Sequence, residues 1–263
     1  MEVRLFVTCL VDAFRPGTGQ AAVAVLERRG AQVACPAGQT CCGQFAYNAG
    51  YREEAAAMAR HWLSVFGGED TPIIALSGSC AAMVRHLYPD LLAGTPDEPQ
   101  ARRVGERVVD LTQWLVGHPG NSVAASAMPV AVHTGCHMRR LLYARQAPLD
   151  VLSQAGARPA ELADNDQCCG FGGTYAMAEP EVSTALADAK LARWREQRAE
   201  GAEALVGSDW GCLLHLAGRL SRQGEEAPVL HVAEWLDLAD EGRLTPDAVR
   251  AAAVFGSRSG VRS

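Results

Sequence analysis

The chain has 263 residues, 48% of them hydrophobic and 21% charged. This composition is typical of a globular protein with one large domain or two domains of roughly 100 to 150 residues. The formal net charge is -6 and the basic residues are scattered, which argues against nucleic acid and anionic membrane surfaces as partners.

The N-terminal stretch MEVRLFVTCLVDAF predicts a first β-strand rather than an export signal. Its apolar run covers only residues 5–11, lies between Arg4 and Asp12, and has no small-residue cleavage site. No segment approaches the roughly eighteen apolar residues that a membrane span needs. We therefore expect a soluble, cytoplasmic protein without a membrane span.

Short apolar runs and helical patterns alternate along the chain. The runs are partly β-branched, which is typical of buried parallel strands, and they cover residues 3–8, 72–77, 129–133 and 203–207. Helical patterns cover residues 19–29, 51–66, 105–116, 180–199 and 212–222. A last strand and helix follow within 228–240. The alternation predicts an α/β protein with mostly parallel sheets.

The nine cysteines are the most informative residues. Without an export signal they indicate a reducing compartment, in which thiols serve metals or catalysis. Eight of them form two quartets with one spacing: Cys9, Cys41, Cys42 and Cys80, then Cys136, Cys168, Cys169 and Cys212. In each quartet 31 residues separate the first cysteine from an adjacent pair followed by glycine, and 37 or 42 residues separate the pair from the last cysteine.

The repeated spacing predicts two modules of one design, related by pseudo-twofold symmetry. We place the first at residues 1–120 and the second at 121–239, and treat 240–263 as a largely disordered tail that lacks a core-forming pattern. Cys35 has no counterpart and is interpreted as a buried apolar thiol. The alternative is a duplicated fold whose cysteines are merely small buried residues.

Four thiols per module, without carboxylates, select a soft metal, either zinc or an iron-sulfur cluster. Side chains on adjacent residues diverge, which disfavours one tetrahedral zinc but suits a cluster, whose irons can each take a different cysteine. The glycine after each pair lets the backbone approach a bulky ligand and turn N–H groups toward inorganic sulfur. A zinc or thiol-based structural or regulatory module remains the alternative.

Three of these cysteines should lie at helix N-termini beyond the carboxyl ends of parallel strands, where ligands bind in such folds. They are Cys80, Cys136 and Cys212, each within about six residues of a predicted strand. The partial positive charge of a helix N-terminus stabilises a thiolate or an anionic cluster.

Five further strings between residues 3 and 238 agree in order and spacing with one known family: LFVTCLVD, QTCCGQ, SGSCAAMVRH, CCGFGGT and LHVAEWL. In these strings the sequence resembles the lactate utilisation protein A family of CCG-domain iron-sulfur proteins, which are related to the cysteine-rich subunit of heterodisulfide reductase and to the iron-sulfur subunit of glycolate oxidase. The resemblance implies two CCG modules whose eight quartet cysteines bind one or two iron-sulfur clusters of the [4Fe-4S] type. It also implies a role in oxidising L-lactate to pyruvate, with partners that include a ferredoxin-like iron-sulfur protein.

The sequence departs from the wider CCG pattern where a fifth cysteine would stand, because Met83 and His215 occupy those positions. We interpret Met83 as a core residue. His133, His137 and His215 lie near the second quartet in sequence, and we weigh hydrogen bonding or capping above proton transfer or iron ligation.

Arg139 and Arg140 suit a substrate carboxylate, yet on a helix after the cluster loop they more often offset charge or face solvent. The chain shows no convincing flavin or nicotinamide motif, although lactate oxidation needs a hydride acceptor. We therefore expect an electron-transfer subunit of an oxidoreductase system that is incomplete alone. Glycolate or glycerol 3-phosphate is the alternative substrate.

Overall fold

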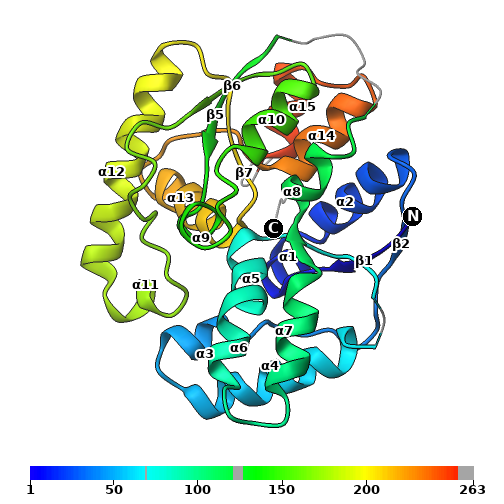
Figure 1. The fold of residues 1–263 in the computed structure, drawn as a ribbon. Helices are drawn as coiled ribbons and strands as arrows, with labels where there is room; N and C mark the ends of the chain where they lie inside the picture. Colours follow the sequence, from blue (N-terminus) through cyan, green and yellow to red (C-terminus); the bar gives the residue numbers. More distant parts are fainter. Residues whose placement is uncertain (69, 121–126, 254–263) are drawn as a thin grey trace, which may run out of the picture.

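The computed structural model describes residues 1–68, 70–120 and 127–253. Two four-stranded sheets, parallel throughout, organise it, with strand orders β2-β1-β3-β4 and β6-β5-β7-β8. The two orders are the same when the second sheet is renumbered from its first strand. The predicted α/β fold with duplicated, parallel-sheet modules is confirmed (Figure 1).

The first sheet contains β1 (Glu2–Phe6), β2 (Gln32–Ala34), β3 (Ile73–Ala75) and β4 (Val108–Asp110). The second contains β5 (Pro129–His133), β6 (Arg158–Glu161), β7 (Ala204–Gly207) and β8 (Val229–His231). The four apolar runs and the last predicted strand all form strands. Strands β2 and β6 were missed because these edge segments, QVA and RPAE, are short and partly exposed.

The helices of the first half are α1 (Cys9–Phe14), α2 (Pro16–Arg28), α3 (Gln44–Asn48), α4 (Arg52–Phe66), α5 (Gly78–Ala82), the π-helix η1 (Met83–Leu87), α6 (Tyr88–Leu91), α7 (Glu98–Glu106) and α8 (Leu111–Val116). Those of the second half are α9 (Cys136–Arg140), α10 (Ala147–Gln154), α11 (Tyr175–Ala178), α12 (Pro180–Ala199), α13 (Trp210–Arg222), α14 (Val232–Asp240) and α15 (Pro246–Ala252).

The single helix predicted for 105–116 is wrong, because β4 interrupts it. The side chain of Asp110 ends the strand and caps α8, accepting a hydrogen bond from the Thr112 backbone N–H at 2.8 Å. Gln113 completes a capping box by accepting from the Asp110 N–H. In the second module His231 and Glu234 form the same box between β8 and α14.

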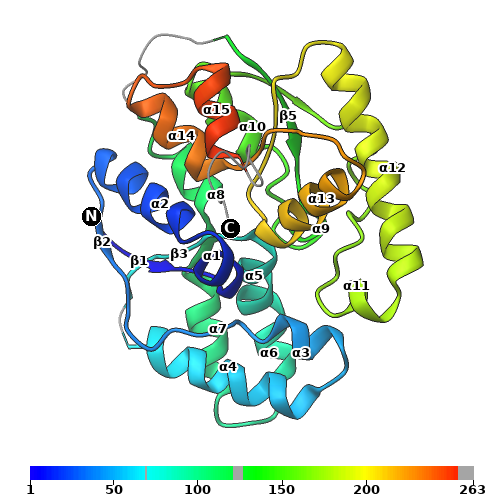
Figure 2. The same ribbon diagram turned by 180° about the vertical axis from the view of Figure 1, so that it is seen from behind.

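The two modules pack on each other reciprocally. Helix α2 of the first lies against α14 of the second, and α8 of the first lies against α10 of the second. Both ribbon views show α2 beside α14 (Figure 2). One hydrophobic cluster includes residues of both sheets, such as Leu5 and Val130. The module boundary near residue 120 borders a segment outside the described residues and stays a prediction.

The predicted tail after Asp240 is corrected in part. Thr245 caps α15 by accepting a hydrogen bond from the Ala248 N–H, and Pro246 occupies its first turn. Val249 and Ala253 are buried, so a single apolar face is enough to dock this segment. The last part of the predicted tail, residues 254–263, lies outside the described residues.

Within the described residues, no helix combines the length and the apolar character needed to cross a membrane.

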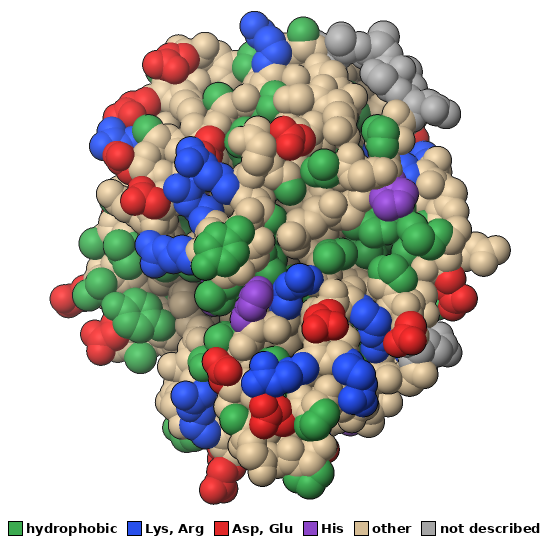
Figure 3. Space-filling view, in the orientation of Figure 1, with side chains coloured by type: hydrophobic (Ala, Val, Ile, Leu, Met, Phe, Trp, Pro, Cys, Tyr) green, Lys and Arg blue, Asp and Glu red, His purple; other side chains and the backbone are tan. Residues whose placement is uncertain are grey.

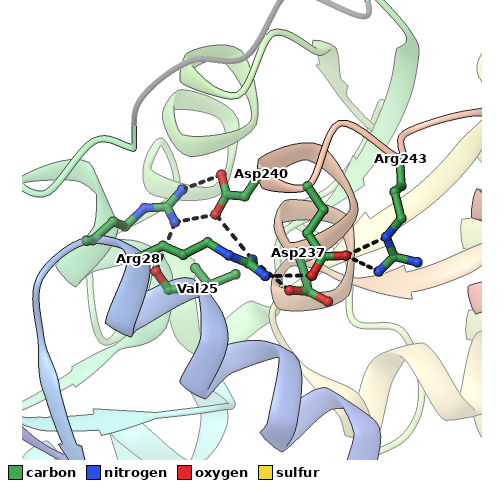
Figure 4. A network of polar contacts seen from close by, with 7 residues as sticks. Val25, Arg28, Asp237, Asp240 and Arg243 are labelled. Carbon is green, nitrogen blue, oxygen red and sulfur yellow. Dashed lines mark hydrogen bonds and ion pairs between the residues drawn. The ribbon is translucent and has the colours of Figure 1, made fainter.

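An ion-pair network joins α2 to α14 (Figure 4). Arg29, whose side chain is only 5% exposed, pairs with Asp240 at 2.6 Å and donates to the Val25 carbonyl at 2.9 Å. Arg28, at 34% exposure, pairs with Asp237 at 2.7 Å. The Arg29–Asp240 pair is therefore shielded from solvent, whereas the Arg28–Asp237 pair is more exposed.

Replacing Asp240 with alanine should destabilise the protein by about 3 kcal/mol, because it leaves the Arg29 charge buried without its partner. Asp237→Ala on the same helix is the matched control, and it should cost under about 1 kcal/mol because its partner is more exposed. Urea unfolding at neutral pH measures both. Equal losses of unfolding free energy in the two variants would show that the burial of Arg29 does not determine the loss of stability.

Candidate metal centre

The fold places the first and last cysteine of each quartet directly after a central strand. Cys9 and Cys136 are the first residues of α1 and α9, after β1 and β5. Cys80 and Cys212 lie in the first turns of α5 and α13, after β3 and β7. The predicted helix-terminal placement of Cys80, Cys136 and Cys212 is confirmed.

The adjacent cysteines lie in loops, each followed by a glycine in the left-handed region. Gly43 has φ +81° and Gly170 has φ +91°. A side chain at Gly170 would place its Cβ 2.3 Å from the Ser183 carbonyl oxygen. Gly170 is therefore needed for both backbone angle and space, which confirms the turn with positive φ; the space that it leaves is taken by protein backbone, and the approach to a bulky ligand stays a prediction.

All eight quartet cysteines line one cavity of about 70 Å³. The sequence predicted two cradles but did not predict that they face each other. Phe45, Asn48, Phe171, Gly172 and Gly173 also line the cavity. Figure 3 shows the surface hollowed between α11 and the helices of the first module. The two quartets thus share one partly open cavity between the modules.

Each quartet has a shallower pair and a deeper pair of sulfurs. In the first, Sγ of Cys9 lies 3.5 Å from Sγ of Cys41, and the buried Cys42 and Cys80 are likewise 3.5 Å apart.

In the second quartet, the buried Cys169 and Cys212 are 3.0 Å apart. Cys136 contacts Cys168, whose sulfur also accepts a hydrogen bond from the Gly170 N–H at 3.3 Å. The backbone after the pair therefore donates to a quartet sulfur, as expected for a cradle around negative charge.

The sulfurs are close enough to share protons. Hydrogen bonds from the thiols of Cys42 and Cys9 hold the pKa of Cys41 well below its usual range. Cys168 has a lowered pKa for the same reason, since thiols flank it on both sides. One thiolate in each quartet is thus stabilised by protonated neighbours, and a metal cation can replace those protons.

The donor atoms do not converge on a single point. Among the described residues, one trio of Cys, His, Asp or Glu donors lies entirely within 4.8 Å, and it consists of His133, Cys169 and Cys212. Within the described residues, no three cysteine sulfurs all lie within 4.8 Å of one another. A tetrahedral zinc needs four converging donors, whereas the separate corners of a cluster fit spread sulfurs.

Two of the three histidines have protein partners. His137 lies 3.4 Å from the Cys136 sulfur and 3.3 Å from the Gln44 amide nitrogen, so it bridges the modules. His215 lies 3.2 Å from the Ser183 hydroxyl. These contacts favour the hydrogen-bonding interpretation for both residues.

His133 differs from them. It is 2% exposed, and no hydrogen bond of ordinary geometry reaches either ring nitrogen. Burial, followed by repulsion from the Lys190 ammonium, lowers the pKa of His133 to about 4. The Asp209 charge and a weak side-chain hydrogen bond with Asn165 oppose this lowering, with smaller effects. The imidazole is therefore neutral at neutral pH.

The remaining candidates lie apart from the cavity. Arg139 pairs with Glu161 at 2.7 Å and Arg140 donates to the Asp166 backbone carbonyl, so both guanidinium groups have partners within the protein. Met83 is in the core, as predicted. Cys35 is exposed, which corrects its interpretation as a buried thiol: it directly follows the edge strand β2.

Sequence reasoning missed Asp209, which joins the two quartets. Its Oδ2 accepts hydrogen bonds from the Ser77 hydroxyl and the Ser79 N–H, both at 2.9 Å, and its Oδ1 accepts from the Gly211 N–H at 3.1 Å. Ser77 and Asp209 also form an antiparallel bridge. Each lies three residues before the last cysteine of its quartet, a signal that the repeat alignment contained.

Comparison with known proteins agrees with this geometry. The CCG cysteine-rich domain family matches the chain twice, at residues 3–85 and 130–217. Lactate utilization protein A of Shouchella clausii (strain KSM-K16) is 40% identical over 241 residues, which cover 90% of this chain and 99% of that protein. The protein of the same name from Geobacillus kaustophilus (strain HTA426) is 42% identical with the same coverage. This chain belongs to the lactate utilization protein A family.

A solved structure extends the comparison of the fold. The crystal structure of a hypothetical protein from Helicobacter pylori superposes with a TM-score of 0.63 at 12% identity. The match covers 94% of this chain but only 50% of that chain. It shows a shared fold, and this family member spans half the length of that larger protein.

Substituting alanine for Gly170 should damage the second quartet through the clash with the Ser183 carbonyl. Gly38→Ala is the matched control, because Gly38 has φ +79° with nothing within 4 Å of an added Cβ. Gly38→Ala should cost roughly 1–2 kcal/mol from backbone strain, and Gly170→Ala roughly a further 1–3 kcal/mol from overpacking. Urea unfolding measures the difference, and equal costs would refute the steric role of Gly170.

Proposed function

We propose that this chain is an iron-sulfur electron-transfer subunit of a multi-protein system that oxidises L-lactate to pyruvate. The observation that carries the proposal is the gathering of eight cysteines, in two quartets, around one cavity. The named relatives support the choice of lactate, since they are lactate utilization proteins.

The donor set fits iron-sulfur clusters. The ligands would be Cys9, Cys41, Cys42 and Cys80 in the first module, and Cys136, Cys168, Cys169 and Cys212 in the second. These hold one or two clusters per chain, of the [4Fe-4S] type. When bound, a cluster supplies a one-electron acceptor and donor whose potential depends on burial and on hydrogen bonds to sulfur.

The protein's own residues would control charge and solvent at this centre. Cys42, Cys80, Cys169 and Cys212 are all under 9% exposed, so the deep side of the cavity is shielded from water. Lys190, buried on α12, adds a positive charge that acts on Cys169 and Cys212. Such a charge offsets the negative charge of a thiolate-ligated cluster.

Asp209 would fix the spacing between the two quartets. Its carboxylate accepts hydrogen bonds from the N-terminal residues of both α5 and α13, the helices that carry Cys80 and Cys212. Clusters held on rigid, hydrogen-bonded elements keep a constant separation, which efficient electron transfer between them requires.

Partners would complete the reaction. Oxidation of lactate releases two electrons, usually as a hydride taken by an organic cofactor. We assign that step to another protein of the system, and assign to this chain the passage of electrons to a ferredoxin-like iron-sulfur protein. The chain would therefore be one component of an oxidoreductase rather than a complete enzyme.

Anaerobic purification followed by iron, sulfide and zinc analysis tests this proposal. The protein should be brown, with about four irons per intact cluster. Cys169→Ala should remove the second cluster and spare the first, and Cys42→Ala should do the reverse, as followed by iron content and EPR. Cys35→Ala is the control, because this thiol is exposed and does not line the cavity.

Two outcomes would contradict the proposal. One is a colourless, iron-free protein that still supports lactate oxidation, and the other is stoichiometric zinc in place of iron. Growth of a strain that lacks this protein, on lactate, glycolate and glycerol 3-phosphate in turn, identifies the substrate of the system. Normal growth of that strain on lactate would argue against lactate as the substrate.

A further inference from the structure

The two quartets have different surroundings at the same place in the fold. At the end of β1, Phe6 pairs in register with Ala75 of β3. At the end of β5, His133 pairs in register with Gly207 of β7. The two modules therefore present an aromatic hydrocarbon and an imidazole at equivalent positions.

In the first module this position belongs to the hydrophobic core. The ring of Phe6 packs edge-on against Trp62 and Phe66, with centroids 5.3 and 5.6 Å apart. A hydrocarbon side chain thus satisfies the fold completely, so strand geometry alone does not require a histidine at the end of β5.

In the second module the imidazole points to the deep pair of sulfurs. One donor atom of His133 and the sulfurs of Cys169 and Cys212 all lie within 4.8 Å of one another. All three side chains are buried. This is the spacing of donors that converge on one metal ion.

A purely structural histidine would be hydrogen-bonded, because an unpaired buried polar group costs roughly 1–3 kcal/mol. His231 follows that rule, since its Nδ1 accepts from the Ala233 N–H at 3.1 Å to cap α14. Neither ring nitrogen of His133 has a hydrogen bond of ordinary geometry, and its side-chain contact with Asn165 is a weaker one. The nearby Lys190 ammonium donates elsewhere, to the Asp164 carbonyl and to Asn165 Oδ1, both at 3.2 Å.

We propose that His133 is a nitrogen donor to the metal centre of the second quartet, which therefore has mixed nitrogen and sulfur ligation while the first has sulfur alone. The inference rests on the proposed function in one respect only, namely that the second quartet holds iron. A neutral imidazole is a good ligand for iron. In this centre it would add a nitrogen donor to the four cysteine sulfurs without replacing any of them.

Pulsed EPR of the full-length protein tests this directly. The protein is prepared anaerobically with iron and sulfide in the Cys42→Ala background, which leaves the second quartet intact, and with histidine labelled with ¹⁵N. The reduced centre should show a strong nitrogen coupling that changes from ¹⁴N to ¹⁵N on labelling. His133→Phe, which installs the residue of the first module, should abolish the coupling and keep the iron, because the four cysteines remain.

A His137→Gln/His215→Gln double variant is the matched control, and it should keep the coupling. If His133→Phe fails to fold, a coupling that persists in the double variant excludes His137 and His215 as its source, and a lost coupling overturns the assignment to His133. The inference is overturned if the iron-loaded protein shows no histidine coupling, if the coupling survives in His133→Phe, or if it disappears in the double variant. Iron-free protein would instead refute the proposed function itself, so the two failures are distinguishable.

Discussion

Mutual repulsion among thiolates is the constraint on which the rest of this structure depends. Each quartet brings its sulfurs to 3.0–3.5 Å contacts within its closest pairs. Four thiolates at that spacing, largely removed from water, are stable only with protons or a cation between them. Protons relieve the repulsion in the metal-free quartets, where neighbouring thiols lower the pKa of Cys41 and Cys168. A bound metal cation would relieve it in the same way, and the glycine turns and helix N-termini around the quartets stabilise negative charge in either case.

Duplication explains why two such quartets meet at one cavity. Each parallel sheet delivers its cysteines at the carboxyl ends of its two central strands, so a single module has one edge of concentrated negative charge. The reciprocal packing of α2 on α14 and of α8 on α10 turns these edges toward each other. Asp209 then ties the last-cysteine helices of the two modules together through Ser77 and Ser79.

The sequence predicted well those features that lie within a single module. The apolar runs and the repeated cysteine spacing identified the central strands, the α/β class and the quartets, because burial on both faces and equal loop lengths leave direct marks on sequence. Strand β4 and helix α8 were merged because Val108–Asp110 is too short to show a period of its own. The shared cavity was out of reach because it depends on packing between modules. The exposure of Cys35 was missed because edge strands carry a weak apolar signal.

The divergence of the two modules carries the remaining functional information. Around the first quartet the structure places Phe6, Trp62 and Phe66 in one aromatic cluster, and Tyr88 donates to the Cys42 carbonyl at 2.9 Å. Around the second it places His133 and the buried Lys190. A hydrocarbon wall disfavours added negative charge, whereas a nearby ammonium stabilises it. In the proposed electron-transfer role, an electron entering this cavity would therefore be drawn from the first quartet toward the second, a direction that two identical modules would not provide.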